Sequence, residues 1–191
     1  HGPVYRPVYA TDDERYLSVC MHADPIGATT AGAVIELAPA GPIRFAACLG
    51  APCTGIFIPL YVAGNLPAVL ARGGAQPSAD SPWWKFRRLL EIVEADPQRH
   101  GPAVRARWDA DEAALMAQAR EVEGRVAAGG AGAAELTAFM QSSTDRVLRR
   151  LDEILESTGG CTSGPPVAQR FAKIVAFGRV PVQTLQPAVT G

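Results

Sequence analysis

The sequence predicts an α+β fold in which an antiparallel sheet is followed by a helical hairpin. Short apolar runs separated by turns rich in Gly, Pro and Asp occupy the first third of the chain, which is typical of neighbouring strands. Two long segments further on have apolar residues at every third or fourth position, which is typical of helices. A chain of 191 residues can bury one core. We therefore expect residues 1–191 to form a single domain or part of one, with strands over 15–62, helices over 82–158 and a tail over 165–191.

Four strands are predicted in the first third of the chain. The turns between them are marked by Asp24-Pro25, by the Pro/Gly cluster at 39–42 and by the glycines at 50 and 55. Connections this short join antiparallel neighbours, because a parallel pair needs a crossover of about a dozen residues or more. The strands are expected over 15–22, 30–37, 43–49 and 56–62.

Three helices are predicted after a surface loop over 64–81. Ser81 is a favourable N-cap and Pro82 suits the first helical position, so the first helix begins here. Pro97 disfavours helical backbone at the residue before it and ends this helix. A short Gly/Ala linker joins the other two helices, which makes them an antiparallel hairpin. The helices are expected over about 82–95, from near Pro102 to Gly129, and over 133–157.

The composition excludes several classes of partner. Eighteen basic and nineteen acidic residues leave a formal net charge of −1, so the chain lacks the positive field that nucleic acid requires. No apolar run approaches the roughly 20 residues that cross a bilayer, and no polybasic run indicates a membrane surface. Four cysteines are too few for a disulfide scaffold and no signal peptide is visible, so we expect a cytoplasmic location. No glycine-rich phosphate loop precedes a helix, and no cofactor is expected.

Cys20 and His22 are the first candidates for chemistry. They lie two residues apart in a predicted strand, so their side chains share one face. Three interpretations stay open: a thiol–imidazole dyad, a buried Cys beside a hydrogen-bonded His, or a His22 that contacts substrate. Neighbours on one strand face stand about 7 Å apart at Cα, which favours the second interpretation. A metal site built from these two residues and either Cys48 or Cys53 lacks specific ligand spacing, so no metal is predicted.

Two further places in the predicted sheet have side chains suited to a pocket. Cys53 lies in a turn punctuated by glycines, where either a small packing residue or a ligand-facing thiol would fit. Thr29 and Thr30 present adjacent hydroxyls at the start of a strand, either as good strand formers or as substrate contacts.

Residues on the predicted helices are given structural interpretations. The aromatic cluster over 83–86 is expected to clamp the first helix onto the sheet. The charges of the two long helices are interpreted as a solvated face, with the apolar stripe opposite them as core or a subunit contact. The charges in question include Arg105, Glu121, Arg149 and Glu153.

Four segments together resemble one enzyme family. They are Ser18-Val19-Cys20-Met21-His22, Thr29-Thr30-Ala31-Gly32-Ala33-Val34, Leu49-Gly50-Ala51-Pro52-Cys53 with Phe57-Ile58-Pro59, and Ser81-Pro82-Trp83-Trp84. In type, order and rough spacing, over about residues 15–90, they resemble elements of the secernins and related dipeptidases, which are N-terminal-nucleophile cysteine amidohydrolases. One departure is Gly32, where the family tends to have Ser.

The resemblance implies an αββα sandwich and an N-terminal Cys thiol that attacks an amide carbonyl, with its own α-amino group as the base. This chain begins with His1, and the family's nucleophile has no counterpart in it. We therefore expect the C-terminal part of a cysteine amidohydrolase or dipeptidase, inactive alone, and carry over no catalytic residue. The substrate would be a dipeptide or another small amide. The candidates for the wall of its pocket are His22, Thr29, Thr30 and Cys53.

Two alternatives belong to other classes. The chain is a non-catalytic interaction module if the apolar stripes of the helix pair over 102–157 face a partner. It is a self-sufficient thiol enzyme if Cys20 and His22 form a working dyad. Because a two-sheet sandwich needs more strands than four, we also expect the isolated chain to need a missing N-terminal segment or to form a homo-oligomer.

Overall fold

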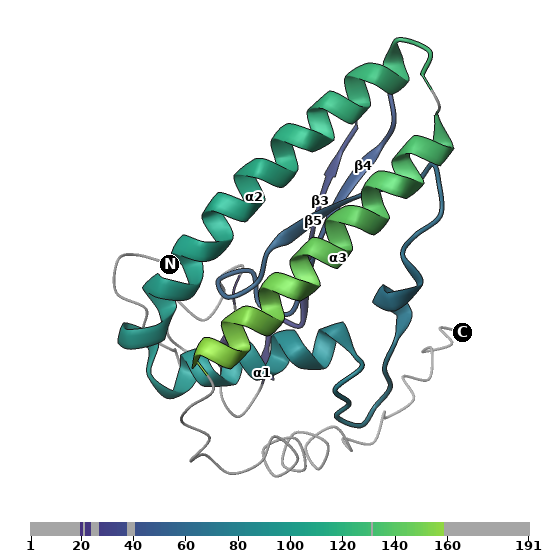
Figure 1. Ribbon diagram of the computed structural model, residues 1–191. Helices are drawn as coiled ribbons and strands as arrows, with labels where there is room; N and C mark the ends of the chain where they lie inside the picture. Colours follow the sequence, from purple (N-terminus) through teal and green to yellow (C-terminus); the bar gives the residue numbers. More distant parts are fainter. Residues whose placement is uncertain (1–19, 21, 24–26, 38–40, 131, 159–191) are drawn as a thin grey trace, which may run out of the picture.

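The computed structural model describes residues 20, 22–23, 27–37, 41–130 and 132–158 of the chain. Within these ranges the fold is α+β, with a three-stranded antiparallel sheet and three α-helices, as predicted (Figure 1). The tail over 165–191 and residues 15–19 of the first predicted strand lie outside the described ranges. In chain order the elements are β1 (His22–Ala23), β2 (Gly27–Ala28), β3 (Ala31–Glu36), β4 (Arg44–Leu49), β5 (Phe57–Tyr61), the 3-10 helix η2 (Ala68–Ala71), α1 (Pro82–Ala95), α2 (Pro97–Ala127) and α3 (Ala133–Thr158).

The main sheet has the strand order β3–β4–β5, and both neighbouring pairs are antiparallel. This confirms three predicted strands and their pairing, with ends that differ by one residue. The register is set by the short turns, and it places Gly32, Cys48 and Phe57 in one row across the sheet. The described end of the first predicted strand is β1, which pairs with β2 in a separate two-stranded sheet.

The start of α2 is where the sequence-based prediction was wrong: the helix begins at Pro97 and not near Pro102. The side chain of Asp96 accepts a hydrogen bond from the backbone N–H of Arg99 at 3.2 Å, which makes Asp96 the N-cap of α2. Pro97 then occupies the first helical position, where its missing N–H leaves no bond unmade. One proline therefore ends α1 and opens α2, and Pro102 lies inside the helix.

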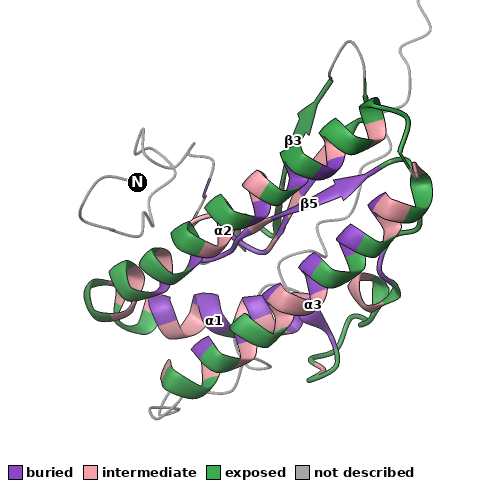
Figure 2. Cartoon of the chain, turned by 45° about the horizontal axis from the view of Figure 1, so that its top comes forward, coloured by how far each residue is buried: buried purple, intermediate pink, exposed green. Residues whose placement is uncertain are grey.

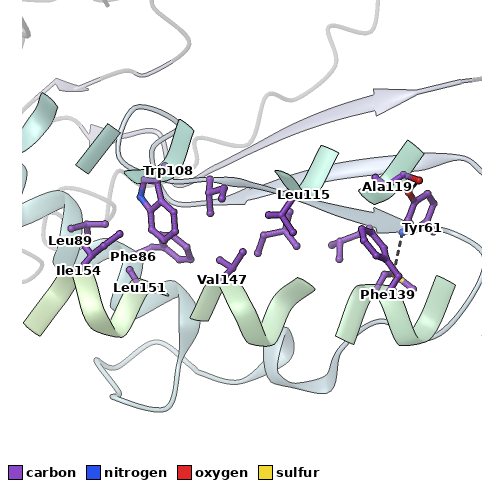
Figure 3. Packing of buried hydrophobic residues seen from close by; sticks show 14 of the residues in the cluster. Tyr61, Phe86, Leu89, Trp108, Leu115, Ala119, Phe139, Val147, Leu151 and Ile154 are labelled. Atoms are coloured by element: carbon purple, nitrogen blue, oxygen red, sulfur yellow. Dashed lines mark hydrogen bonds between the residues drawn. The ribbon is translucent and has the colours of Figure 1, made fainter. Parts of the chain in front are cut away.

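The two long helices run side by side with the main sheet behind them, and α1 crosses near their lower ends (Figure 1). Their apolar stripes are buried within this chain. Trp108 and Leu115 of α2 and Leu151 and Ile154 of α3 have no exposed surface, and they join side chains of α1 and β5 in one core (Figure 3). The interaction-module hypothesis rested on these stripes being available to a partner, and their burial removes that support.

The β5 edge of the main sheet is closed by the two long helices. Phe57 donates its backbone N–H to Oε2 of Glu112 on α2 at 3.1 Å, and Tyr61 donates its own to Sδ of Met140 on α3 at 3.2 Å. Pro59, midway between them, has no N–H to donate. The outward-facing backbone N–H groups of this edge are thus already bonded to helix side chains, or are missing at Pro59. Another strand therefore cannot pair with β5 here.

The opposite edge of the sheet, β3, is exposed. Val34 and Ile35, which point to opposite faces, are 57% and 58% exposed. Figure 2 shows the contrast between exposed β3 and buried β5. An apolar strand edge of this kind is a site for pairing with further strands.

Candidate functional site

The candidate site is built on the β4–β5 loop, which we define as residues 50–56. Gly50 opens the loop with φ +88°, a left-handed conformation that glycine adopts without strain. The backbone N–H groups of Thr54 and Gly55 both donate to the carbonyl of Ala51, at 3.1 and 2.9 Å. Ala51 and Ile56 are buried at the base of the loop. The loop is therefore a tight, internally bonded turn.

Helix α2 holds this loop through two side chains one turn apart. Trp108 donates Nε1–H to the carbonyl of Thr54 at 2.9 Å. Arg105 donates from Nη1 to the carbonyls of Gly55 at 3.0 Å and Pro52 at 3.4 Å. Three loop carbonyls thus receive donors from one helix face.

The carbonyl contacts overturn the interpretation of Arg105 as part of a solvated face. Its guanidinium also pairs with Asp109 at 2.6 Å, and Glu112 lies 3.6 Å away. Carboxylates at these positions orient the guanidinium toward the loop, since residues four and seven apart share a helix face. The sequence does show that four side chains share one face of the helix: Arg105, Trp108, Asp109 and Glu112. This spacing does not reveal which distant backbone carbonyls Arg105 and Trp108 bind.

Thr30 joins the start of β3 to the loop and to α1. Its backbone carbonyl accepts hydrogen bonds from the N–H of Gly50 at 3.0 Å and from Nε1–H of Trp83 at 2.9 Å. The Trp83 contact agrees with the predicted aromatic clamp between the first helix and the sheet. The predicted role of Thr30 as a hydroxyl contact remains a prediction, because the observed bonds use the main chain.

Cys20 and Cys53 are brought together. The backbone N–H of Cys53 donates to Sγ of Cys20 at 3.1 Å, and a side-chain hydrogen bond also joins the two residues. That bond, followed by burial, raises the pKa of the Cys53 thiol. The Cys53 side chain is half-buried, while Cys20 is buried. The structure thus places Cys53 against another thiol at the tip of the loop.

Cys48 is the third cysteine of this region and lies under the loop. Burial, then the neighbouring Cys20 and Glu112, raises its pKa to about 12. A thiol with a raised pKa stays protonated at neutral pH and is a poor nucleophile. Cys48 and Cys53 are therefore unsuited to attack an amide.

His22 and Thr29 flank this cluster along the chain. His22 pairs with Ala28 in the β1–β2 hairpin, so its backbone lies opposite the residue before Thr29. Thr29 is half-buried and directly precedes Thr30. Their predicted roles in a pocket wall remain predictions, as does the Cys20–His22 dyad.

Gly32 has a packing reason to be glycine. A Cβ at this position would lie 3.1 Å from Cγ of Pro52 and 3.6 Å from two ring atoms of Phe57. The Phe57 ring thus reaches across Cys48 to the edge strand, which its position in the same row of the sheet allows. A larger side chain here, such as serine, would press on Pro52.

Replacing Arg105 with alanine is expected to loosen the β4–β5 loop, because the carbonyls of Pro52 and Gly55 lose their donor. Alkylation of Cys53 by a small thiol reagent should then become faster, as followed by peptide mass spectrometry. The exposed Arg149 of α3 provides the control, and Arg149→Ala should leave the rate unchanged. Equal rates in the two variants would show that Arg105 does not hold the loop.

Stability is expected to fall at alkaline pH through Cys48. Its thiol titrates near pH 9.0 when solvated and at about 12 in the fold, so the unfolded state releases the proton first. The stability that the buried, protonated thiol contributes is complete below pH 9.0 and is lost as the pH rises toward 12. Urea unfolding of Cys48→Ala should show a shallower decline over this window than the unaltered chain. An unchanged decline would exclude Cys48 as its source.

No family model matches the sequence, and neither the curated proteins nor the solved structures contain a match. In the part of the chain that the structure describes, no helix is long and apolar enough to cross a membrane. Within the same residues, no group of three or more His, Cys, Asp or Glu side chains could hold a metal ion.

Proposed function

We propose that this chain is the C-terminal part of a cysteine amidohydrolase of the N-terminal-nucleophile type, similar to the secernins and related dipeptidases. The enzyme would cleave dipeptides or other small amides with an N-terminal Cys on polypeptide outside these 191 residues. One observation carries the proposal: described residues from each of the four segments behind the resemblance are joined by hydrogen bonds in and beside the β4–β5 loop, namely Cys20, Thr30, Gly50, Cys53 and Trp83.

The meeting point is defined by specific contacts. Cys20, from the first segment, accepts the N–H of Cys53 in the third. Thr30, from the second, accepts from Gly50 in the third and from Trp83 in the fourth. Within the loop, Pro52 and Cys53 are half-buried and the other five residues are buried. In the proposal, these two residues would form the part of the pocket wall that the substrate reaches.

The state of the thiols supports a nucleophile located elsewhere. Cys48 and Cys53 have raised pKa values, and Cys20 is 8% exposed. An attacking thiol needs thiolate character and access to the substrate carbonyl. In the proposal, the loop residues therefore shape the pocket, and the base is the α-amino group of the absent N-terminal Cys.

The proposed αββα sandwich assigns a place to the absent polypeptide. The β5 edge is closed by Glu112, Pro59 and Met140, whereas no strand of the described ranges pairs with the outer edge of β3. Strands of the preceding polypeptide would pair with β3 and extend the sheet, which would bring an N-terminal Cys toward the Thr30 end of the loop. This layout explains why the edge is apolar.

The test is dipeptide hydrolysis by the full-length gene product. Cys53→Leu adds bulk to the proposed wall and should raise KM about tenfold, equivalent to about 1.4 kcal/mol of binding, with a smaller change in kcat. Gly124→Ala, near the far end of α2, should leave both constants unchanged. A full-length product that hydrolyses no dipeptide or small amide would refute the function. Unchanged kinetics in Cys53→Leu would refute the role of Cys53 in the pocket wall but not the proposed hydrolysis.

A further inference from the structure

Cys20 and Cys53 lie in contact, and this contact has no role in the proposed amide hydrolysis. The two thiols are linked by a hydrogen bond between their side chains, and the N–H of Cys53 lies 3.1 Å from Sγ of Cys20. The residues are 33 positions apart, so their meeting is a property of the fold and not of local sequence. Thiols held this close are at a high effective concentration for each other.

We propose that Cys20 and Cys53 are a reversible oxidation site, at which a peroxide converts the two thiols into an intramolecular disulfide. Cys20 is the sulfur that reacts first, because its Sγ accepts a hydrogen bond from the backbone N–H of Cys53. Hydrogen bonds to a sulfur favour its anionic form. Hydrogen peroxide is small enough to reach a residue that is 8% exposed.

The reaction balances in two steps. The Cys20 sulfur attacks one oxygen of hydrogen peroxide, the O–O bond breaks, and a sulfenic acid and one water form. The Cys53 sulfur then attacks the sulfenic sulfur, the S–O bond breaks, and the hydroxyl leaves with the Cys53 proton as a second water. Two thiols lose two electrons in total, and one peroxide is reduced to two waters. A dithiol reductant reverses the change by thiol–disulfide exchange.

Cys48 provides the internal comparison. Its Sγ lies 4.0 Å from the carbonyl oxygen of Gly50, and a Cβ on Gly55 would lie only 2.5 Å from it. The sulfur is therefore enclosed by the inner side of the loop, and the residue is 1% exposed. Cys53, at the tip of the loop, is the residue whose main chain and side chain both bond Cys20.

The disulfide would join the segment before β1 to the β4–β5 loop. A cross-link over 33 positions restricts the unfolded chain, so oxidation should raise the melting temperature. It would also consume the only thiol that the β4–β5 loop contains. Oxidation thereby changes the chemistry of the candidate site without altering the core beneath it.

Peptide mapping after peroxide treatment tests the proposal. Cys48 and Cys53 fall on one tryptic peptide, 45–72, and Cys20 falls on another, 16–44. The experiment therefore uses the Cys48→Ser/Cys161→Ser variant, in which one cysteine remains on each peptide. The expected result is a cross-linked pair of peptides lighter by two hydrogen atoms than their sum, together with a melting temperature that rises and returns after treatment with a dithiol.

Matched variants identify the two sulfurs. Cys20→Ser and Cys53→Ser, each in the chain that keeps Cys48 and Cys161, should show neither the cross-link nor the reversible rise in melting temperature. Cys20→Ala serves as the second variant if Cys20→Ser does not fold. The proposal is overturned if the two-cysteine variant forms only separate sulfinic or sulfonic acids. It is equally overturned if the reversible rise persists in Cys53→Ser, since another pair would then be responsible.

Discussion

Replacing Trp108 with alanine is expected to lower the free energy of unfolding by about 3–5 kcal/mol, the range for large aromatic residues removed from a core. Trp108 has no exposed surface, and its ring packs 6.1 Å from that of Phe86, centroid to centroid. It also donates the hydrogen bond to the carbonyl of Thr54, so the substitution removes both core packing and an anchor of the β4–β5 loop. Urea denaturation followed by circular dichroism measures the change without relying on tryptophan fluorescence.

Trp108→Phe separates the two roles of this side chain. The phenyl ring keeps part of the packing but leaves the Thr54 carbonyl without its donor, so a loss of about 1–3 kcal/mol is expected. The alanine variant should be clearly less stable than the phenylalanine variant. A loss below about 1 kcal/mol for Trp108→Ala would show that this residue does not anchor the core.

Gly55→Ala is expected to destabilise the fold by about 1–3 kcal/mol through overpacking at the base of the loop. The added Cβ would lie 2.5 Å from Sγ of Cys48, 3.2 Å from the carbonyl oxygen of Ala51 and 3.4 Å from that of Leu49. These neighbours are buried or belong to the main chain, so they cannot move aside easily. The same denaturation measurement gives the change in the free energy of unfolding.

Two further variants make this expectation specific. Cys48→Ala removes the sulfur that the new Cβ meets, so Gly55→Ala should cost less in that background than in the unaltered chain. Gly124 of α2 has no atom within 4 Å of its would-be Cβ, and Gly124→Ala should stabilise the helix by up to about 1 kcal/mol. Strictly additive costs at positions 48 and 55 would contradict the packing explanation.

Much of the fold is visible in the sequence because its signals are local. The turn residues and alternating apolar runs predict β3, β4 and β5 to within one residue, and the Ser81-Pro82 pair predicts the start of α1. The Ser81 hydroxyl does accept the N–H of Trp84, at 3.4 Å. The start of α2 was missed because a proline that ends one helix can also open the next, and sequence reasoning assigned Pro97 only the first role.

The candidate site was predicted less completely, because its contacts are made by backbone groups and by residues far apart in the chain. Thr30 was selected for its hydroxyl, whereas the observed junction uses its carbonyl, which every residue possesses. Arg105 was interpreted as solvated, since nothing local indicates that it meets carbonyls 50 and 53 positions earlier. Cys53 was selected because it lies in a turn punctuated by glycines, and its role in a pocket wall stays a prediction. Its contact with Cys20 depends on how the loop folds back, which the local sequence does not reveal.

The most direct test of the proposed enzyme is to locate the residue that an affinity label modifies. A dipeptide carrying a thiol-reactive electrophile at its scissile carbonyl is incubated with the full-length gene product, and the modified peptide is identified by mass spectrometry. We expect the label on an N-terminal Cys that precedes His1, with Cys20, Cys48 and Cys53 unmodified. Stoichiometric, substrate-protected labelling of any of these three cysteines would contradict the assignment of the loop as a pocket wall that lacks the nucleophile.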